Sequence, residues 1–194
     1  MDIISQISQV GQSLWYDNIQ RSLILNGTIE ALIKAGKIRG ITSNPAIFQK
    51  AISESREYDE SLKPMAWAGL DKETIFWQMA VEDIQKAADL FLPVFLTSGG
   101  KDGFVSLEVN PFFAYDTQRT IEDARKLWEK VGRKNLMIKI PATKEGLPAI
   151  RRAISEGINV NVTLIFSIER SSSTNRRTGC TPRRACWCIS CIPG

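Results

Sequence analysis

The chain of 194 residues is long enough for one substantial hydrophobic core and too short for two ordinary enzyme domains. Apolar residues make up 43% and charged residues 24%, and no run approaches the roughly 18 apolar residues of a membrane-spanning helix. The first residues lack a basic segment followed by an apolar one. We therefore expect a cytoplasmic protein with no membrane partner.

Charge and cysteine are concentrated at one end of the chain. The segment 171–194 contains four arginines, no acidic residue and all four cysteines, which are Cys180, Cys186, Cys188 and Cys191. Residues 1–170 are therefore neutral, which gives no electrostatic footprint for a nucleic-acid partner. They also contain neither cysteine nor histidine, which excludes thiol nucleophiles, Ser-His-Asp triads and histidine metal sites there.

Two kinds of segment alternate along residues 1–170. Short apolar runs that predict strands lie at residues 13–16, 38–42, 104–109, 136–140 and 160–166. Helical spacing of apolar residues is found at residues 19–35, where Asn26-Gly27 is expected to break the helix, and at 72–91, 117–131 and 145–154. This alternation predicts an α/β protein with a parallel sheet.

The last predicted strand has two unlike faces. Asn159, Asn161 and Thr163 share one face, and Val160, Val162 and Leu164 share the other. The polar face suits the interior of a (β/α) barrel near its catalytic end. It equally suits an edge strand with one face in solvent, and the strand alone leaves both interpretations open.

Lys139 is the first candidate for chemistry. It lies in the otherwise apolar strand Leu-Met-Ile-Lys-Ile-Pro. Burial of an ammonium group is costly and favours the neutral amine that a Schiff-base nucleophile requires. The alternative is a lysine at a strand end whose amine extends to solvent.

Two carboxylates also lie in apolar runs. Asp17 follows Leu-Trp-Tyr, and Glu108 lies in Val-Ser-Leu-Glu-Val. A carboxylate in such a setting can take a hydroxyl proton and return it. The alternatives are a helix N-cap for Asp17 and a buried ion pair for Glu108.

Thr42-Ser43-Asn44-Pro45 combines a strand end with a helix start. A residue before proline favours extended geometry, and proline suits the first turn of a helix. The pattern places the Asn44 amide at the carboxyl edge of the sheet, where it either binds a ligand or only caps the helix.

The tail cysteines have the spacing C-x5-C-x-C-x2-C, in which only the last pair has the gap of a zinc knuckle. A short disordered tail explains the segment better than a metal site or a nucleic-acid-binding site.

Three segments resemble the transaldolase family. Residues 40–48 (GITSNPAIF) look like its first signature, 136–147 (LMIKIPATKEGL) like the second, and 159–166 (NVNVTLIF) like its next barrel strand. The similarity runs in order from about Ser13 to Arg170. It implies a (β/α)8 TIM-barrel fold, sugar phosphates as substrates, and no metal or cofactor.

The resemblance also implies roles for individual residues. Lys139 would attack the ketone of a ketose phosphate and form an iminium, and Asp17 would take the hydroxyl proton at the carbon–carbon bond that breaks. In the family, sedoheptulose 7-phosphate donates a dihydroxyacetone unit and glyceraldehyde 3-phosphate accepts it, in the pentose phosphate pathway.

Further roles follow from the same resemblance. Glu108 and Thr163 would hold the water that relays protons during imine formation. Asn44, Asn161 and Ser43 would bind the dihydroxyacetone unit.

The chain also departs from the family. Five barrel strands can be counted, whereas a closed barrel usually takes about 250 residues. Nothing after Arg170 matches the strands that carry the family's phosphate-binding serine and arginines. We therefore expect an incomplete barrel over 1–170, an altered and disordered tail over 171–194, and a chain that is unstable and weakly active.

Two other functions remain open at this stage. One is a fructose-6-phosphate-type aldolase, a lyase that releases free dihydroxyacetone. The other is a non-catalytic fragment whose tail binds zinc or nucleic acid. The sequence leaves the oligomeric state undetermined.

Overall fold

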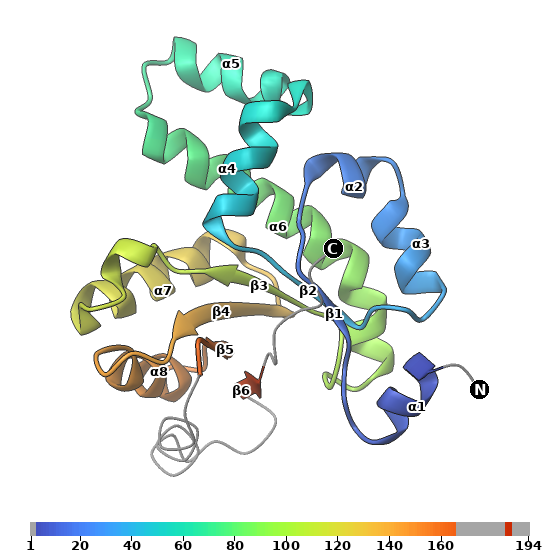
Figure 1. The fold of residues 1–194 in the computed structure, drawn as a ribbon. Coiled ribbons are helices and arrows are strands. Elements are labelled where there is room, and N and C mark those ends of the chain that lie inside the picture. Colours follow the sequence, from blue (N-terminus) through green and yellow to red (C-terminus); the bar gives the residue numbers. More distant parts are fainter. Residues whose placement is uncertain (1–2, 166–184, 188–194) are drawn as a thin grey trace. The chain divides into compact units, whose positions relative to one another are not determined.

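The computed structural model describes residues 3–165 and 185–187 (Figure 1). The chain divides into two compact units, Met1–Val105 and Ser106–Gly194. The boundary predicted near residue 170 lies outside the described residues.

The first unit is mainly helical. Its helices are α1 (Ile3–Gln9), α2 (Arg21–Leu25), α3 (Thr28–Lys34), α4 (Pro45–Glu54), η1 (Arg56–Tyr58), α5 (Asp59–Trp67) and α6 (Lys72–Thr97). Its strands β1 (Trp15–Tyr16) and β2 (Gly40–Thr42) pair in parallel, with Trp15 opposite Gly40 and Tyr16 opposite Ile41.

The second unit alternates strands with helices. It contains most of β3 (Phe104–Glu108), then η2 (Pro111–Phe113), α7 (Thr117–Val131), β4 (Leu136–Pro141), α8 (Gly146–Ser155), β5 (Val160–Thr163) and β6 (Ala185–Trp187). Strand β4 pairs in parallel with β5, and β5 pairs in parallel with β6. The Val109 N–H donates to the Lys139 carbonyl at 3.1 Å, which links the end of β3 to β4. The predicted α/β class with parallel strands is therefore confirmed.

Most predicted elements are found with small changes at their ends. The helix predicted at 117–131 is α7, which begins where the Asp116 carboxylate accepts from the Arg119 N–H at 3.0 Å. The predicted break at Asn26-Gly27 separates α2 from α3, because Gly27 adopts a left-handed φ of 79°. Helix α6 continues beyond the predicted end at 91, through Pro93 to Thr97.

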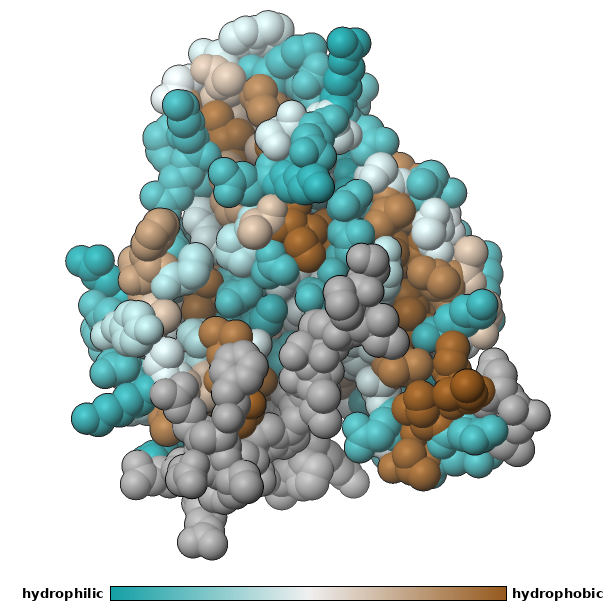
Figure 2. Space-filling model, viewed as in Figure 1, coloured by the Kyte–Doolittle hydropathy of each residue, from teal (hydrophilic) through white to brown (hydrophobic). Residues whose placement is uncertain are grey.

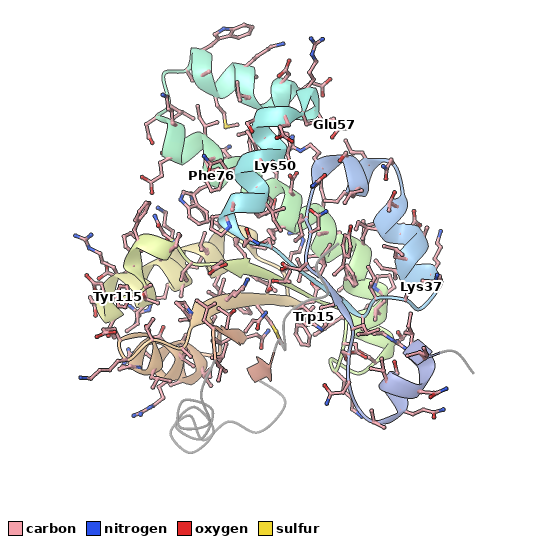
Figure 3. All side chains as sticks on the ribbon, in the orientation of Figure 1. Trp15, Lys37, Lys50, Glu57, Phe76 and Tyr115 are labelled. Carbon is pink, nitrogen blue, oxygen red and sulfur yellow. The ribbon has the colours of Figure 1, made fainter. Side chains whose placement is uncertain are left out.

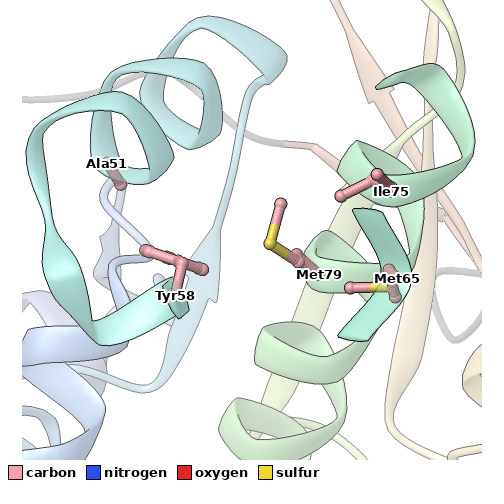
Figure 4. Close-up of a cluster of buried hydrophobic side chains, with 5 residues drawn as sticks. All are labelled: Ala51, Tyr58, Met65, Ile75 and Met79. Carbon is pink, nitrogen blue, oxygen red and sulfur yellow. The ribbon is translucent and has the colours of Figure 1, made fainter. Parts of the chain in front are cut away.

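A buried cluster joins four helical segments of the first unit. Figure 4 shows Ala51 and Tyr58, from α4 and η1, opposite Met65, Ile75 and Met79, from α5 and α6. Short helices such as these gain most of their stability from packing of their apolar faces rather than from helix propensity. The cluster packs α4, the helix that follows Asn44, against η1, α5 and α6.

A polar cluster lies beside it. The Arg21 Nε donates to Asp83 Oδ1 at 2.7 Å, and the Tyr58 hydroxyl donates to Asp83 Oδ2 at 2.7 Å. Arg21 also reaches Glu82 at 3.0 Å and Ser61 at 2.9 Å. The cluster therefore ties α2, η1 and α5 to α6.

In the second unit, α7 and α8 lie beside each other. Their apolar faces are buried at Ile121, Ala124, Leu127, Val131, Ala149, Ile150 and Ala153. At the solvent side, Arg125 Nε donates to Glu156 Oε2 at 2.7 Å, and Arg152 contacts the same carboxylate. Both kinds of contact fix α8, which follows the strand that carries Lys139.

Apolar side chains also reach the surface. Brown atoms gather over α1 in Figure 2. Ile3, the first residue of this helix, is 73% exposed, and Val10, which follows its last residue, is 74% exposed. Tyr115, labelled in Figure 3, projects outward between η2 and α7 and is 81% exposed. Within residues 3–165 and 185–187, no helix combines the length and hydrophobicity needed to cross a membrane.

Candidate active site

The second unit brings Lys139 and Glu108 together. Lys139 Nζ lies 3.3 Å from Glu108 Oε2, and the two side chains are 12% and 15% exposed. The alternative in which Lys139 extends into solvent is therefore wrong. The ion pair considered for Glu108 is present, and its partner is the candidate nucleophile.

Asn161 belongs to the same face of the sheet. It lies beside Lys139 in the register of β4 and β5, it is fully buried, and its Nδ2 donates to Ser106 Oγ at 3.1 Å. Strand β5 has a neighbour on each side, β4 and β6, so it is not an edge strand with a face in solvent. Of the two interpretations of its polar face, only the interior position agrees with the structure.

Thr163 is two residues further along β5 than Asn161, and so on the same face of the strand. It is paired with Pro141, and its carbonyl accepts from the Ala142 N–H at 2.8 Å. Its side chain is partly exposed. Thr163 therefore lies nearer the carboxyl end of the sheet than Lys139 and Asn161, by two residues along the strand.

The loop after β4 is held tightly. The Thr143 hydroxyl donates to the Ala114 carbonyl at 2.6 Å and accepts from the Gly146 N–H at 2.8 Å. A Cβ at Gly146 would lie 2.1 Å from the Pro141 carbonyl oxygen, so only glycine fits there. This is the physical reason for Thr143 and Gly146 in the second signature: together they fix the end of the strand that carries Lys139.

The first unit holds the other candidates at one sheet edge. Strands β1 and β2 are parallel and in register, so Asp17 and Ser43 both follow carboxyl ends of neighbouring strands. Ser43 is fully buried, and Oδ1 of Asp17 is inaccessible to solvent. The capping role considered for Asp17 is wrong, because α2 begins at Arg21 with Gln20 at its N-cap.

Asn44 does cap a helix. Its backbone is extended (φ −140°, ψ 157°), Pro45 begins α4, and its Oδ1 accepts from the Ile47 N–H at 2.9 Å. The predicted geometry is confirmed. The cap engages the carbonyl end of the amide and not its NH2 group, so capping fixes the direction in which that donor points.

Gly40, the first residue of the first signature, is required by a close approach. A Cβ there would lie 2.5 Å from the indole of Trp15, which is labelled in Figure 3. Trp15 is opposite Gly40 in the pairing of β1 with β2. The glycine therefore lets the strand that leads to Asp17 lie against the strand that leads to Ser43 and Asn44.

Two polar residues near Lys139 were missed by the sequence analysis. Ser106 and Thr143 both make hydrogen bonds that fix their surroundings. A strand period of two could have identified Ser106, because it places Ser106 on the same face as Glu108. Thr143 carries no comparable periodic signal, since it lies in a loop.

The candidate metal site in the tail lies outside the described residues, except that Ala185–Trp187 form β6. In that strand Cys186 is paired with Asn161 in the register of β5. The prediction of a disordered tail over 171–194 is therefore wrong at these three residues, which pair with β5. Among the residues that the structure describes, no three His, Cys, Asp or Glu side chains are grouped to hold a metal ion.

Comparison with known proteins identifies the family. The family model described as Transaldolase/Fructose-6-phosphate aldolase matches residues 14–175. The chain belongs to this family. Its fold is accordingly of the family's (β/α) barrel type, and the described part contains the five strands β1–β5 expected of an incomplete barrel, together with β6.

Individual relatives are also similar over most of the chain. A transaldolase of Trichodesmium erythraeum is 47% identical over 169 residues, and one of Thermobifida fusca is 49% identical over 167 residues. These alignments cover 87% and 86% of this chain, but only 44% and 45% of the relatives. The chain thus spans slightly less than half the length of these transaldolases.

Proposed function

We propose that the chain carries the Schiff-base chemistry of a transaldolase, in which Lys139 is the nucleophile. The supporting observation is the Lys139–Glu108 pair, 3.3 Å apart and largely shielded from water. Glu108 is within reach to accept a proton from the Lys139 ammonium, directly or through one water. The resulting amine is a nucleophile for a ketone carbon.

The reaction proceeds through defined bonds. The Lys139 Nζ bonds to C2 of the ketose phosphate, and the C2 oxygen leaves as water to give an iminium. The C3–C4 bond then breaks, and its electron pair moves into the iminium to give an enamine. We assign to Asp17 the role of accepting the proton that the C4 hydroxyl loses. C4 and its oxygen then become the carbonyl group of the released aldose phosphate.

Transfer completes the cycle. The enamine carbon attacks the aldehyde carbon of an acceptor aldose phosphate, whose oxygen takes up the proton from Asp17, and water releases the new ketose from Lys139. We propose sedoheptulose 7-phosphate as donor and glyceraldehyde 3-phosphate as acceptor, in the pentose phosphate pathway. Thr163 would help Glu108 to hold the relay water, while Ser43, Asn44 and Asn161 would bind the dihydroxyacetone unit.

Borohydride trapping tests the nucleophile. The purified chain is incubated with fructose 6-phosphate and borohydride, and the modified peptide is mapped by mass spectrometry. We expect a reduced dihydroxyacetone adduct on Lys139 and none in Lys139→Arg, which keeps the charge but cannot form the imine. Lys144→Arg is the matched control, because Lys144 is exposed in the following loop. An unmodified Lys139 in a folded sample would contradict the proposal and favour the non-catalytic fragment.

An aldolase is the second candidate, because the matching family model covers both activities. Assays with and without an acceptor aldehyde separate the two. Free dihydroxyacetone in the absence of acceptor indicates the lyase. A requirement for acceptor indicates the transferase, which the names of the 44–49% identical relatives favour.

A further inference from the structure

A buried serine lies in the middle of the strand that carries Glu108. Ser106 is fully buried between Val105 and Leu107 in the sequence of β3, and it shares a strand face with Glu108 two residues later. A buried hydroxyl needs a hydrogen-bond partner to offset the loss of water. The identity of that partner shows what the serine does.

One partner is Asn161, on a strand that is not adjacent to β3. The Asn161 Nδ2 donates to Ser106 Oγ at 3.1 Å, and both residues have no exposed surface. Strand β4 lies between β3 and β5. The residue of β4 that is in register with Asn161 is Lys139. The hydrogen bond therefore crosses β4 at the level of the candidate nucleophile.

The bond also selects one orientation of the amide. An asparagine side chain can present either its NH2 group or its carbonyl oxygen to a neighbour, and the two ends differ in hydrogen-bonding character. With the NH2 group directed to Ser106, the carbonyl end is turned to a different direction. A half-turn of the amide would exchange a donor for an acceptor beside Lys139.

We infer that Ser106 is a positioning residue that acts through Asn161. It holds the Asn161 amide in one orientation, and in that orientation the amide hydrogen-bonds to a polyhydroxylated carbon chain bound to Lys139. The inference rests on the proposed function, and it adds a residue to which that function gives no role. Ser106 itself need not touch the substrate.

A double-mutant cycle tests this role. Ser106→Ala removes the acceptor, and Ser106→Cys fills nearly the same volume with a weaker acceptor. Each is combined with Asn161→Ala, and the second-order rate of borohydride trapping by fructose 6-phosphate at Lys139 is measured together with its dependence on ketose concentration. Thr120→Val is the matched control, because Thr120 is a buried residue whose hydroxyl donates to the Phe113 carbonyl at 2.8 Å.

We expect Ser106→Ala to lower the trapping rate roughly three- to tenfold, the range of one hydrogen bond, chiefly by raising the ketose concentration needed for half-saturation. Ser106→Cys should be intermediate. In the Asn161→Ala background, Ser106→Ala should have no further effect, because the group that it positions is absent. Thr120→Val should trap at the wild-type rate.

Three outcomes would overturn the inference. Equal trapping by Ser106→Ala and wild type would remove the role of Ser106 and leave Lys139 as the nucleophile. Fully additive effects of Ser106→Ala and Asn161→Ala would show that the serine does not act through Asn161. Absence of any adduct in the folded wild-type chain would overturn the proposed function, and the positioning role with it.

Discussion

The two units each contain a buried pair of opposite charges, and the two pairs differ in the way their charges are shielded. Arg21 and Asp83 are 2.7 Å apart, with 3% and 0% of their side chains exposed. Lys139 and Glu108 are 3.3 Å apart, with 12% and 15% exposed. The Arg21–Asp83 pair has the shorter separation and is almost fully buried, and we call it the sealed pair. The Lys139–Glu108 pair has the longer separation, and a small part of each side chain remains exposed.

The sealed pair is also surrounded by further polar partners. Asp83 accepts from Tyr58 as well as from Arg21, and Arg21 reaches Ser61 and Glu82. Burial lowers the pKa of Arg21, but the charges and hydrogen bonds of Asp83 and Glu82 outweigh it and raise the pKa overall. Burial and the hydrogen bond to Asp83 raise the pKa of Tyr58. These groups keep their protons, so the cluster holds helices together and is unsuited to proton transfer.

The largest expected effect on stability comes from removing one charge of the sealed pair. Asp83→Asn leaves Arg21 charged and buried with its main counter-charge removed, so we expect a loss of about 3 kcal/mol in the free energy of unfolding. Urea unfolding followed by circular dichroism measures it. Asp89→Asn is the matched control, because Asp89 is exposed on the same helix, and we expect a change within about 0.5 kcal/mol.

A double replacement separates charge from packing at this site. Arg21→Met with Asp83→Leu removes both charges and keeps apolar volume, so it should be less destabilising than Asp83→Asn alone. Equal stability of Asp83→Asn and Asp89→Asn would show that the sealed pair does not hold the helices.

Replacement of a residue in the Lys139–Glu108 pair should affect the chemistry more than the stability of the fold. Lys139→Met leaves Glu108 without its counter-charge, but Glu108 keeps 15% of its side chain exposed, whereas the Arg21 charge that Asp83→Asn leaves behind is 3% exposed. We therefore expect a smaller loss in the free energy of unfolding than in Asp83→Asn, while borohydride trapping is abolished. Lys144→Met, at an exposed position, serves as the control for loss of a lysine. A loss of stability as large as that of Asp83→Asn would give the Lys139–Glu108 pair a structural role as well.

Local patterns in the sequence predict much of the fold and part of the site. Helix α7 and strand β4 follow from apolar periodicity within a single element. The strand period places Asn161 and Thr163 on one face, whereas the apolar strand around Lys139 left open whether its amine is buried or extends to solvent. These properties depend only on neighbours along the chain.

Contacts between distant residues could not be predicted in the same way. Arg21 and Asp83 are separated by 62 positions, and Ser106 and Asn161 by 55. Neither pair has a periodic signature, and a serine in a strand is a weak signal by itself. Strand β6 was missed because its surroundings show no alternation, and its pairing depends on the edge that β5 offers.

The smallest expected effect concerns a third charged cluster, formed by Arg125, Arg152 and Glu156 at the surface of the second unit. Its side chains are more exposed to solvent than those of the two buried pairs. Hydrogen bonds from Arg125 and Arg152 lower the pKa of Glu156 to about 2. Because this pKa lies below the unfolded value, the stabilisation is complete above about pH 4.5 and is lost as the pH falls toward 2. Urea midpoints of wild type and Glu156→Gln should therefore differ modestly at pH 7, and the difference should narrow steadily as the pH falls from about 4.5 toward 2. High salt should reduce the difference at pH 7, because exposed charges are screened. A difference that stays constant from pH 7 to pH 3 would contradict the ion-pair origin and point to the packing of α8 against α7.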